Sequence, residues 1–132
     1  MLTGCANFQI KDDANSMATA YLAGKGMGLT INKLAPRIDA DLSNEWRAMM
    51  ASNTGAIVPG TAIVQFYNRT ALLMTGNVDD PYGLLADLSV LLTLYGAQYA
   101  PDKKLVFVQD APRAVLEYFE LGYSGGKRLA LK

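Results

Sequence analysis

Five prolines divide the chain into segments of helical length, and this spacing constrains the fold more than any other feature of the sequence. Proline has no amide hydrogen and disrupts a helix interior, so each one marks a boundary or the first turn of a new helix. A length of 132 residues favours one domain with a substantial core. We therefore predict a compact all-α bundle of about five helices over residues 13–132. The prolines stand at positions 36, 59, 81, 101 and 112.

Four of the five predicted helices follow from apolar residues at helical spacing and from capping residues at their starts. The fourth opens with Asp80 as the N-cap and Pro81 at the first helical position, and continues as an apolar run. The fifth opens at Asp110. The four predicted elements are Asp13 to Lys33, a helix starting near Asp39, Asp80 to Tyr99, and a helix starting at Asp110.

The third interval, Gly60 to Thr75, has the length of a helix, but its first residues are β-branched and aromatic, as in strands. A second apolar stretch, Leu105 to Val108, is a short connector or a strand. An α+β fold with short strands near 61–67 and 105–108 is therefore the alternative.

Two pairs of glycines, each four residues apart, lie in the first and last predicted helices: Gly24 with Gly28, and Gly122 with Gly126. A glycine inside a helix costs about 1 kcal/mol relative to alanine, so such helices need compensation. Close approach of another helix supplies it, and we expect the first and last helices to cross at these glycines. In the alternative, Gly24 and Gly122 only end their helices.

Composition excludes several kinds of function. Twelve basic and 12 acidic residues give a net charge of zero and a pI near 6.2, without the basic excess of a nucleic-acid-binding protein. The chain has no histidine and one cysteine. Zinc sites of His and Cys, His-activated nucleophiles and intramolecular disulfides are excluded.

No motif defines a catalytic centre, and we predict no catalytic residue, cofactor or metal site. An enzyme without histidine would depend on a tyrosine or on one of three carboxylates, Asp87, Glu117 or Glu120. Trp46 with Met49 and Met50 either packs in the core or lines an adaptable apolar pocket.

Two further stretches suggest contact with a membrane. The segment from Tyr82 to Ala100 carries one charge, at Asp87, and is either the central core helix or a membrane span. Lys127, Arg128 and Lys132 form a small basic end, which is either solvated or faces lipid phosphates.

The only strong local motif is Leu2-Thr3-Gly4-Cys5, and it resembles the lipobox of bacterial lipoproteins. The resemblance implies cleavage before Cys5, diacylglycerol on its thiol, and residues 1–12 as lipobox remnant and tether. In that family an Asp directly after the cysteine often retains the protein at the inner membrane. Ala6 at this position therefore favours the outer membrane, facing the periplasm, in a bacterium with two membranes.

We therefore expect a non-catalytic binding or structural module, held to a bacterial envelope by lipid on Cys5. Its partners would be the membrane and an envelope protein or an apolar ligand, and no nucleic acid. The alternative is a small cytosolic domain with an apolar ligand pocket, in which the Leu-Thr-Gly-Cys sequence is a coincidence.

Overall fold

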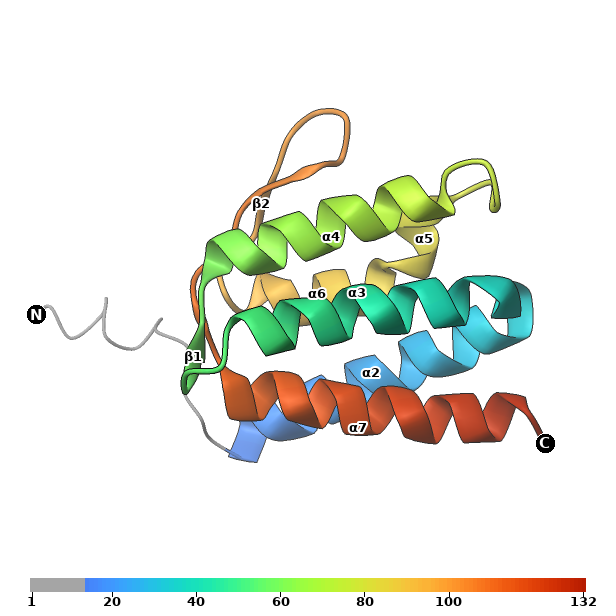
Figure 1. Ribbon diagram of the computed structural model, residues 1–132, viewed down its shortest axis with the longest axis horizontal. Coiled ribbons are helices and arrows are strands. Elements are labelled where there is room, and N and C mark those ends of the chain that lie inside the picture. The colour runs from blue at the N-terminus through green and yellow to red at the C-terminus, as the bar shows by residue number, and fades with distance from the viewer. Residues whose placement is uncertain (1–13) are drawn as a thin grey trace, which may run out of the picture.

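The computed structural model describes residues 14–132 and shows a mostly helical molecule (Figure 1). This confirms the predicted fold class. The described part of the chain contains six α-helices and one 3-10 helix. They are α2 (Ala14–Leu34), η1 (Pro36–Ile38), α3 (Asp39–Ser52), α4 (Gly60–Met74), α5 (Pro81–Leu84), α6 (Ala86–Thr93) and α7 (Arg113–Ala130).

Two small antiparallel pairs of strands complete the fold. β1 (Ile57–Val58) pairs with β4 (Ala111–Pro112), and β2 (Gln98–Tyr99) pairs with β3 (Leu105–Phe107). The strand expected near 105–108 is therefore present, whereas the one expected near 61–67 is wrong. The apolar residues after Gly60 are buried at helical spacing, so α4 packs as a helix despite its β-branched start.

The long helices α3, α4 and α7 lie roughly alongside one another, with α5 and α6 behind them (Figure 1). Large apolar side chains from all these layers fill one core. Those that are completely or almost completely buried include Ile31, Ile63, Leu88, Leu91 and Val115.

The first and last helices of the described chain, α2 and α7, run side by side in the same direction (Figure 1). A Cβ on Gly28 would overlap the carbonyl oxygen of Tyr123, and one on Gly126 would overlap the carbonyl oxygen of Lys25. Both glycines are buried inside helices, and neither has a positive φ. The predicted crossing is confirmed. The four glycines at this contact are Gly24, Gly28, Gly122 and Gly126.

The fourth predicted helix is shorter than expected. Asp80 caps it as predicted, accepting a hydrogen bond from the backbone nitrogen of Gly83 at 3.0 Å. The helix then breaks at Leu85, whose φ of −91° and ψ of 3° separate α5 from α6. The chain turns again at Gly96, which has a φ of +73°. Across residues 14–132, no helix has the length and apolar character needed to cross a membrane.

Asp110 is not the N-cap of the last helix, and that prediction is wrong. Helix α7 begins at Arg113, after β4. The pairing of β1 with β4 brings Asp110 beside the start of α4, where its Oδ1 accepts a hydrogen bond from the backbone nitrogen of Gly60 at 2.8 Å. Asp110 therefore stabilises the N-terminus of a helix 50 residues earlier in the chain.

Candidate functional site

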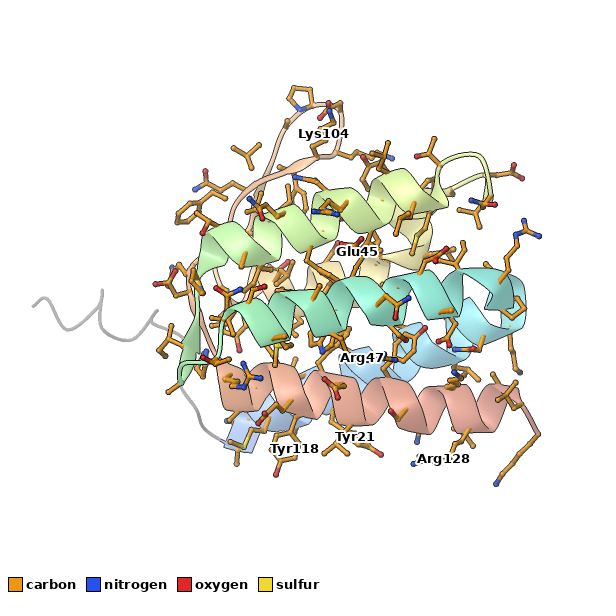
Figure 2. All side chains as sticks on the ribbon, in the orientation of Figure 1. Tyr21, Glu45, Arg47, Lys104, Tyr118 and Arg128 are labelled. Atoms are coloured by element: carbon orange, nitrogen blue, oxygen red, sulfur yellow. The ribbon has the colours of Figure 1, made fainter. Side chains whose placement is uncertain are left out.

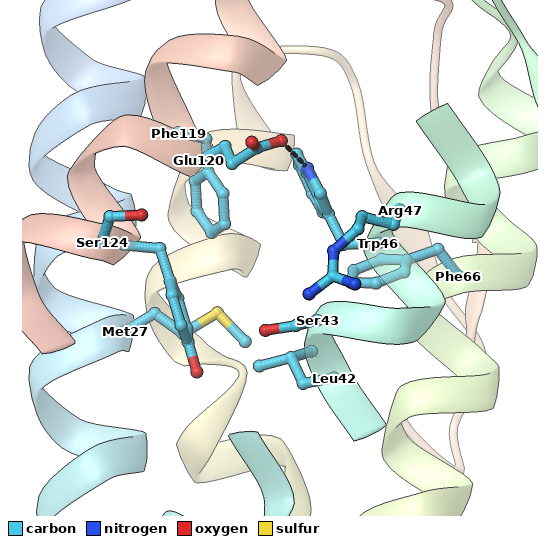
Figure 3. Close-up of a pocket in the computed structure, with 10 residues that line it drawn as sticks. Met27, Leu42, Ser43, Trp46, Arg47, Phe66, Phe119, Glu120 and Ser124 are labelled. Atoms are coloured by element: carbon cyan, nitrogen blue, oxygen red, sulfur yellow. Dashed lines mark hydrogen bonds between the residues drawn. The ribbon is translucent and has the colours of Figure 1, made fainter. Parts of the chain in front are cut away.

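A cavity of about 160 Å³ lies between α3 and α7, with side chains of α2 and α4 at its back (Figure 3). Its walls are mostly apolar and aromatic, and its rim is polar. The apolar residues that line it are Met27, Leu42, Trp46, Phe66 and Phe119.

Trp46 is the central side chain of the apolar wall. Its indole stacks on Phe119, with ring centroids 5.3 Å apart and an interplanar angle of 27°. It also meets Phe66 edge to face, at a centroid distance of 5.2 Å and an angle of 82°. Both arrangements are favourable for aromatic pairs. The three rings therefore join α3, α4 and α7 and give the cavity a fixed wall.

One hydrogen bond across the cavity fixes the indole further. Trp46 Nε1 donates to Glu120 Oε1 at 2.7 Å, from α3 to α7 (Figure 3). A bond to a carboxylate is stronger than one between neutral groups. It occupies one oxygen of the only acidic residue in the lining. The other polar lining residues near the rim are Ser43, Arg47 and Ser124, which all carry hydrogen-bond donors.

The remaining wall residue, Tyr123, is held by a partly buried polar network. Its hydroxyl donates to Asp39 Oδ1 at 2.8 Å, and Lys127 Nζ donates to Asp39 Oδ2 at 2.6 Å. Asn32 Nδ2 also donates to Asp39 Oδ1, at 3.3 Å. This network ties the start of α3 to α2 and α7.

Two pKa values are perturbed in this network. Burial raises the pKa of Asp39, but the hydrogen bonds from Lys127, Tyr123 and Asn32 outweigh burial and leave that pKa below its ordinary value. Burial and the charge of Asp39 raise the pKa of Tyr123. Tyr123 therefore stays a neutral donor at physiological pH.

The carboxylates considered for catalysis have three different environments. Glu120 bonds to Trp46 at the cavity, while Glu117 forms an ion pair with Arg113 at 3.4 Å. Asp87 lies against α2, where a Cβ on Gly26 would come within 2.9 Å of its Oδ2. Burial raises the pKa of Asp87. The fold does not gather these groups into one site.

Sequence reasoning found part of the cavity. Trp46, Met49 and Met50 are all buried in the core, as one of the two alternatives predicted, and of the three only Trp46 also lines the cavity. Glu120 was considered only as a carboxylate, and its bond to the indole was not anticipated. Cys5 and the tether 1–12 lie outside the described residues. The lining residues that the sequence does not single out are Met27, Leu42, Ser43, Arg47, Phe66, Phe119, Tyr123 and Ser124.

Comparisons of the chain with protein-family models, curated proteins and solved structures gave no match.

Proposed function

We propose that the chain is a lipid-anchored, non-catalytic binding module of a bacterial envelope, and that the cavity beside Trp46 holds its ligand. The observation that carries the proposal is a cavity of about 160 Å³ with a preformed aromatic wall and a polar rim. Ligand sites in proteins typically combine such apolar walls with a few placed polar groups.

The size of the cavity limits the ligand to one small group. An engineered apolar cavity of about 150 Å³ in another protein binds benzene. By this comparison, the cavity accepts one aromatic ring or a branched aliphatic group, presented by a small molecule or by a side chain of a partner protein. A ring placed here would contact Phe66 and the Trp46 indole.

The rim favours a ligand with a hydrogen-bond acceptor at its polar end. Arg47, Ser43 and Ser124 carry donors, and in the described part of the chain Arg47 forms no ion pair. Glu120 already receives a hydrogen bond from Trp46. A carboxylate that binds Arg47 with two parallel hydrogen bonds would be recognised most strongly. The proposed ligand class is therefore a small aromatic or aliphatic carboxylate.

Thermal unfolding of the full chain tests the ligand class with three single-ring probes. A ligand that binds only the native state raises Tm. We expect phenylacetate to raise Tm more than toluene, and benzylamine to have no effect. Ser43→Phe should fill the cavity and abolish the shift, whereas the control Ser52→Phe, on the exposed end of the same helix, should retain it. Equal shifts in Tm with all three probes, or no shift with any of them, would refute the ligand class.

The anchor is supported by Leu2-Thr3-Gly4-Cys5, and it has its own test. The gene is expressed with its native upstream region in cells fed a fatty-acid analogue, and the membranes are fractionated. The native protein should be labelled and sediment with membranes, while Cys5→Ser should lose both properties. If Cys5→Ser behaves like the native protein, the anchor is wrong, and the cytosolic ligand-binding alternative replaces it.

A further inference from the structure

We propose that the side of the α2–α7 pair that points away from the core binds an anionic lipid surface. We call this side the outer face. It consists of two helical stripes, one on each helix. Its residues are Tyr21, Leu22, Lys25 and Leu29 of α2, and Tyr118, Leu121, Arg128 and Leu129 of α7.

The glycine contacts determine which side of the pair is exposed. Because α2 and α7 meet through their glycines and bury their apolar stripes on the core side, the outer stripes face away from the core. The α7 stripe and Leu22 are exposed, whereas the other α2 residues of the face are half-buried. Leu22 is 66% exposed, Leu121 is 57%, Leu129 is 42% and Tyr118 is 40%. Figure 2 shows Tyr118 and Arg128 projecting from the edge of the molecule formed by α7 and α2.

Charge is distributed unevenly between this side and the rest of the molecule. Residues 14–34 and 113–132 carry six of the 12 basic side chains and only two of the 12 acidic ones. Glu117 pairs with Arg113, Lys127 pairs with Asp39 of α3, and Glu120 accepts a hydrogen bond from Trp46. Among the described residues, the basic side chains of these two segments that form no ion pair are Lys25, Lys33, Arg128 and Lys132. A chain with zero net charge thus presents a basic side, on which Lys25 and Arg128 flank exposed leucines.

This combination fits a lipid surface better than a second copy of the chain. Leucine inserts below the headgroups, tyrosine lies at their level, and lysine and arginine attract anionic lipids. In a symmetric dimer through the same face, Arg128 and Lys25 would meet like charges, and the nearest acidic residue on this stripe of α7, Glu117, is already paired with Arg113.

The proposed anchor adds geometric support, and this step alone rests on the proposed function. Nine peptide units separate Cys5 from Ala14, so even a fully extended tether spans only about 30 Å. Helix α2, with 21 residues, is about 31 Å long. A lipid on Cys5 would therefore keep the outer face within reach of the bilayer.

Co-sedimentation with vesicles tests the proposal without the anchor. The full chain carrying Cys5→Ser is mixed with vesicles of phosphatidylcholine, with or without phosphatidylglycerol. We expect binding only to the anionic vesicles, and weaker binding when salt rises from about 0.1 M to about 0.5 M. Because no lipid is attached, failure of the anchor leaves this result unchanged.

Four further variants localise the binding. Leu121→Glu and Arg128→Glu should each weaken it about tenfold. Two control variants should leave vesicle binding unchanged. They are Leu72→Glu, at an exposed position of α4, and Lys104→Glu, in the loop at the opposite edge of the molecule (Figure 2). Circular dichroism confirms that each variant folds. Equal binding to both vesicle types, or equal losses in the controls, would overturn the proposal. A dimer in sedimentation that Leu121→Glu dissociates would instead assign the face to a second copy.

Discussion

Adding a single methyl group at Gly126 tests how closely α2 and α7 approach. The Cβ of an alanine there would overlap the carbonyl oxygen of Lys25 and would lie 2.7 Å from the backbone nitrogen of Leu29. Both of these neighbours are backbone atoms, so no change of side-chain rotamer relieves the clash. The two helices must move apart, which also loosens the other glycine contacts.

The expected change in stability is the sum of two opposed effects. Replacing a helical glycine with alanine contributes about 1 kcal/mol in helix propensity. Overpacking a tight contact costs about 1–3 kcal/mol, and here the rigid backbone places the cost at the upper end. We therefore expect Gly126→Ala to lower the free energy of unfolding by about 1–2 kcal/mol.

The adjacent glycine supplies a matched control. At Gly125 an added Cβ would lie 3.4 Å from the hydroxyl oxygen of Tyr21 and 4.0 Å from Arg128 Nη2, which are ordinary contacts. Gly125→Ala should therefore raise the free energy of unfolding by up to about 1 kcal/mol. The two Gly→Ala substitutions, at adjacent positions, are thus expected to change the free energy of unfolding in opposite directions.

Urea unfolding followed by circular dichroism measures both values by linear extrapolation. The slope should be unchanged if each variant unfolds in one step. A Gly126→Ala protein as stable as the native chain, or a similar gain for both variants, would refute the close-packed contact.

Two other predictions concern polar groups that join distant parts of the chain. Asp39→Asn should lower stability by about 1–3 kcal/mol at neutral pH, because Lys127 and the other donors lose a charged acceptor. The pKa of Asp39 is lower when folded than its ordinary value, so its contribution is present above about pH 4 and disappears as the pH falls through the folded pKa. Urea midpoints measured across this range should fall with acidification for the native protein and fall less for Asp39→Asn; parallel curves would contradict the network. Asp110→Ala should cost about 1 kcal/mol by removing the acceptor of the Gly60 amide, while Asp79→Ala, in an exposed loop, should change little. Equal urea midpoints for these two variants would exclude the capping role of Asp110.

Local signals in the sequence were sufficient to predict three of the long helices, the start of α5 and one tertiary contact, but they left α4 open between helix and strand. Helical spacing of apolar residues predicted α2, α3 and α7, and the proline and aspartate at 80–81 predicted the start of α5. The contact between α2 and α7 was predictable because glycines inside a helix carry an energetic cost that only close packing offsets. Each of these features is encoded within one or two turns of helix.

Features that depend on a distant partner, and leave no local signal of their own, were not predictable in this way. In the apolar run after Pro81, Gly83 weakens the helix, but the residue at the break itself, Leu85, is a strong helix former and gives no signal that the helix ends there. Asp110 has the local pattern of an N-cap, and only the pairing of β1 with β4 assigns it to Gly60.

Most of the cavity, apart from Trp46, escaped prediction for the same reason. Its walls come from α2, α3, α4 and α7, and its central bond joins residues 74 positions apart, Trp46 and Glu120. Glu117 and Glu120 are three residues apart, and two charged residues at this spacing on one helix face usually indicate a solvated surface. Nothing within α7 alone shows that Glu120 meets an indole of another helix.

The fluorescence of Trp46 tests most directly whether the cavity binds a ligand, because this is the only tryptophan of the chain and it lines the cavity. Phenylacetate has about ten non-hydrogen atoms. A modest binding free energy for each of these atoms corresponds to a Kd of about 1 mM. We expect a saturable change in emission with phenylacetate, and binding about tenfold weaker in Arg47→Ala, because a charge-assisted hydrogen bond is lost. Ser43→Phe should abolish the change. Emission that does not saturate, or that responds equally in Ser43→Phe, would contradict a binding site at Trp46.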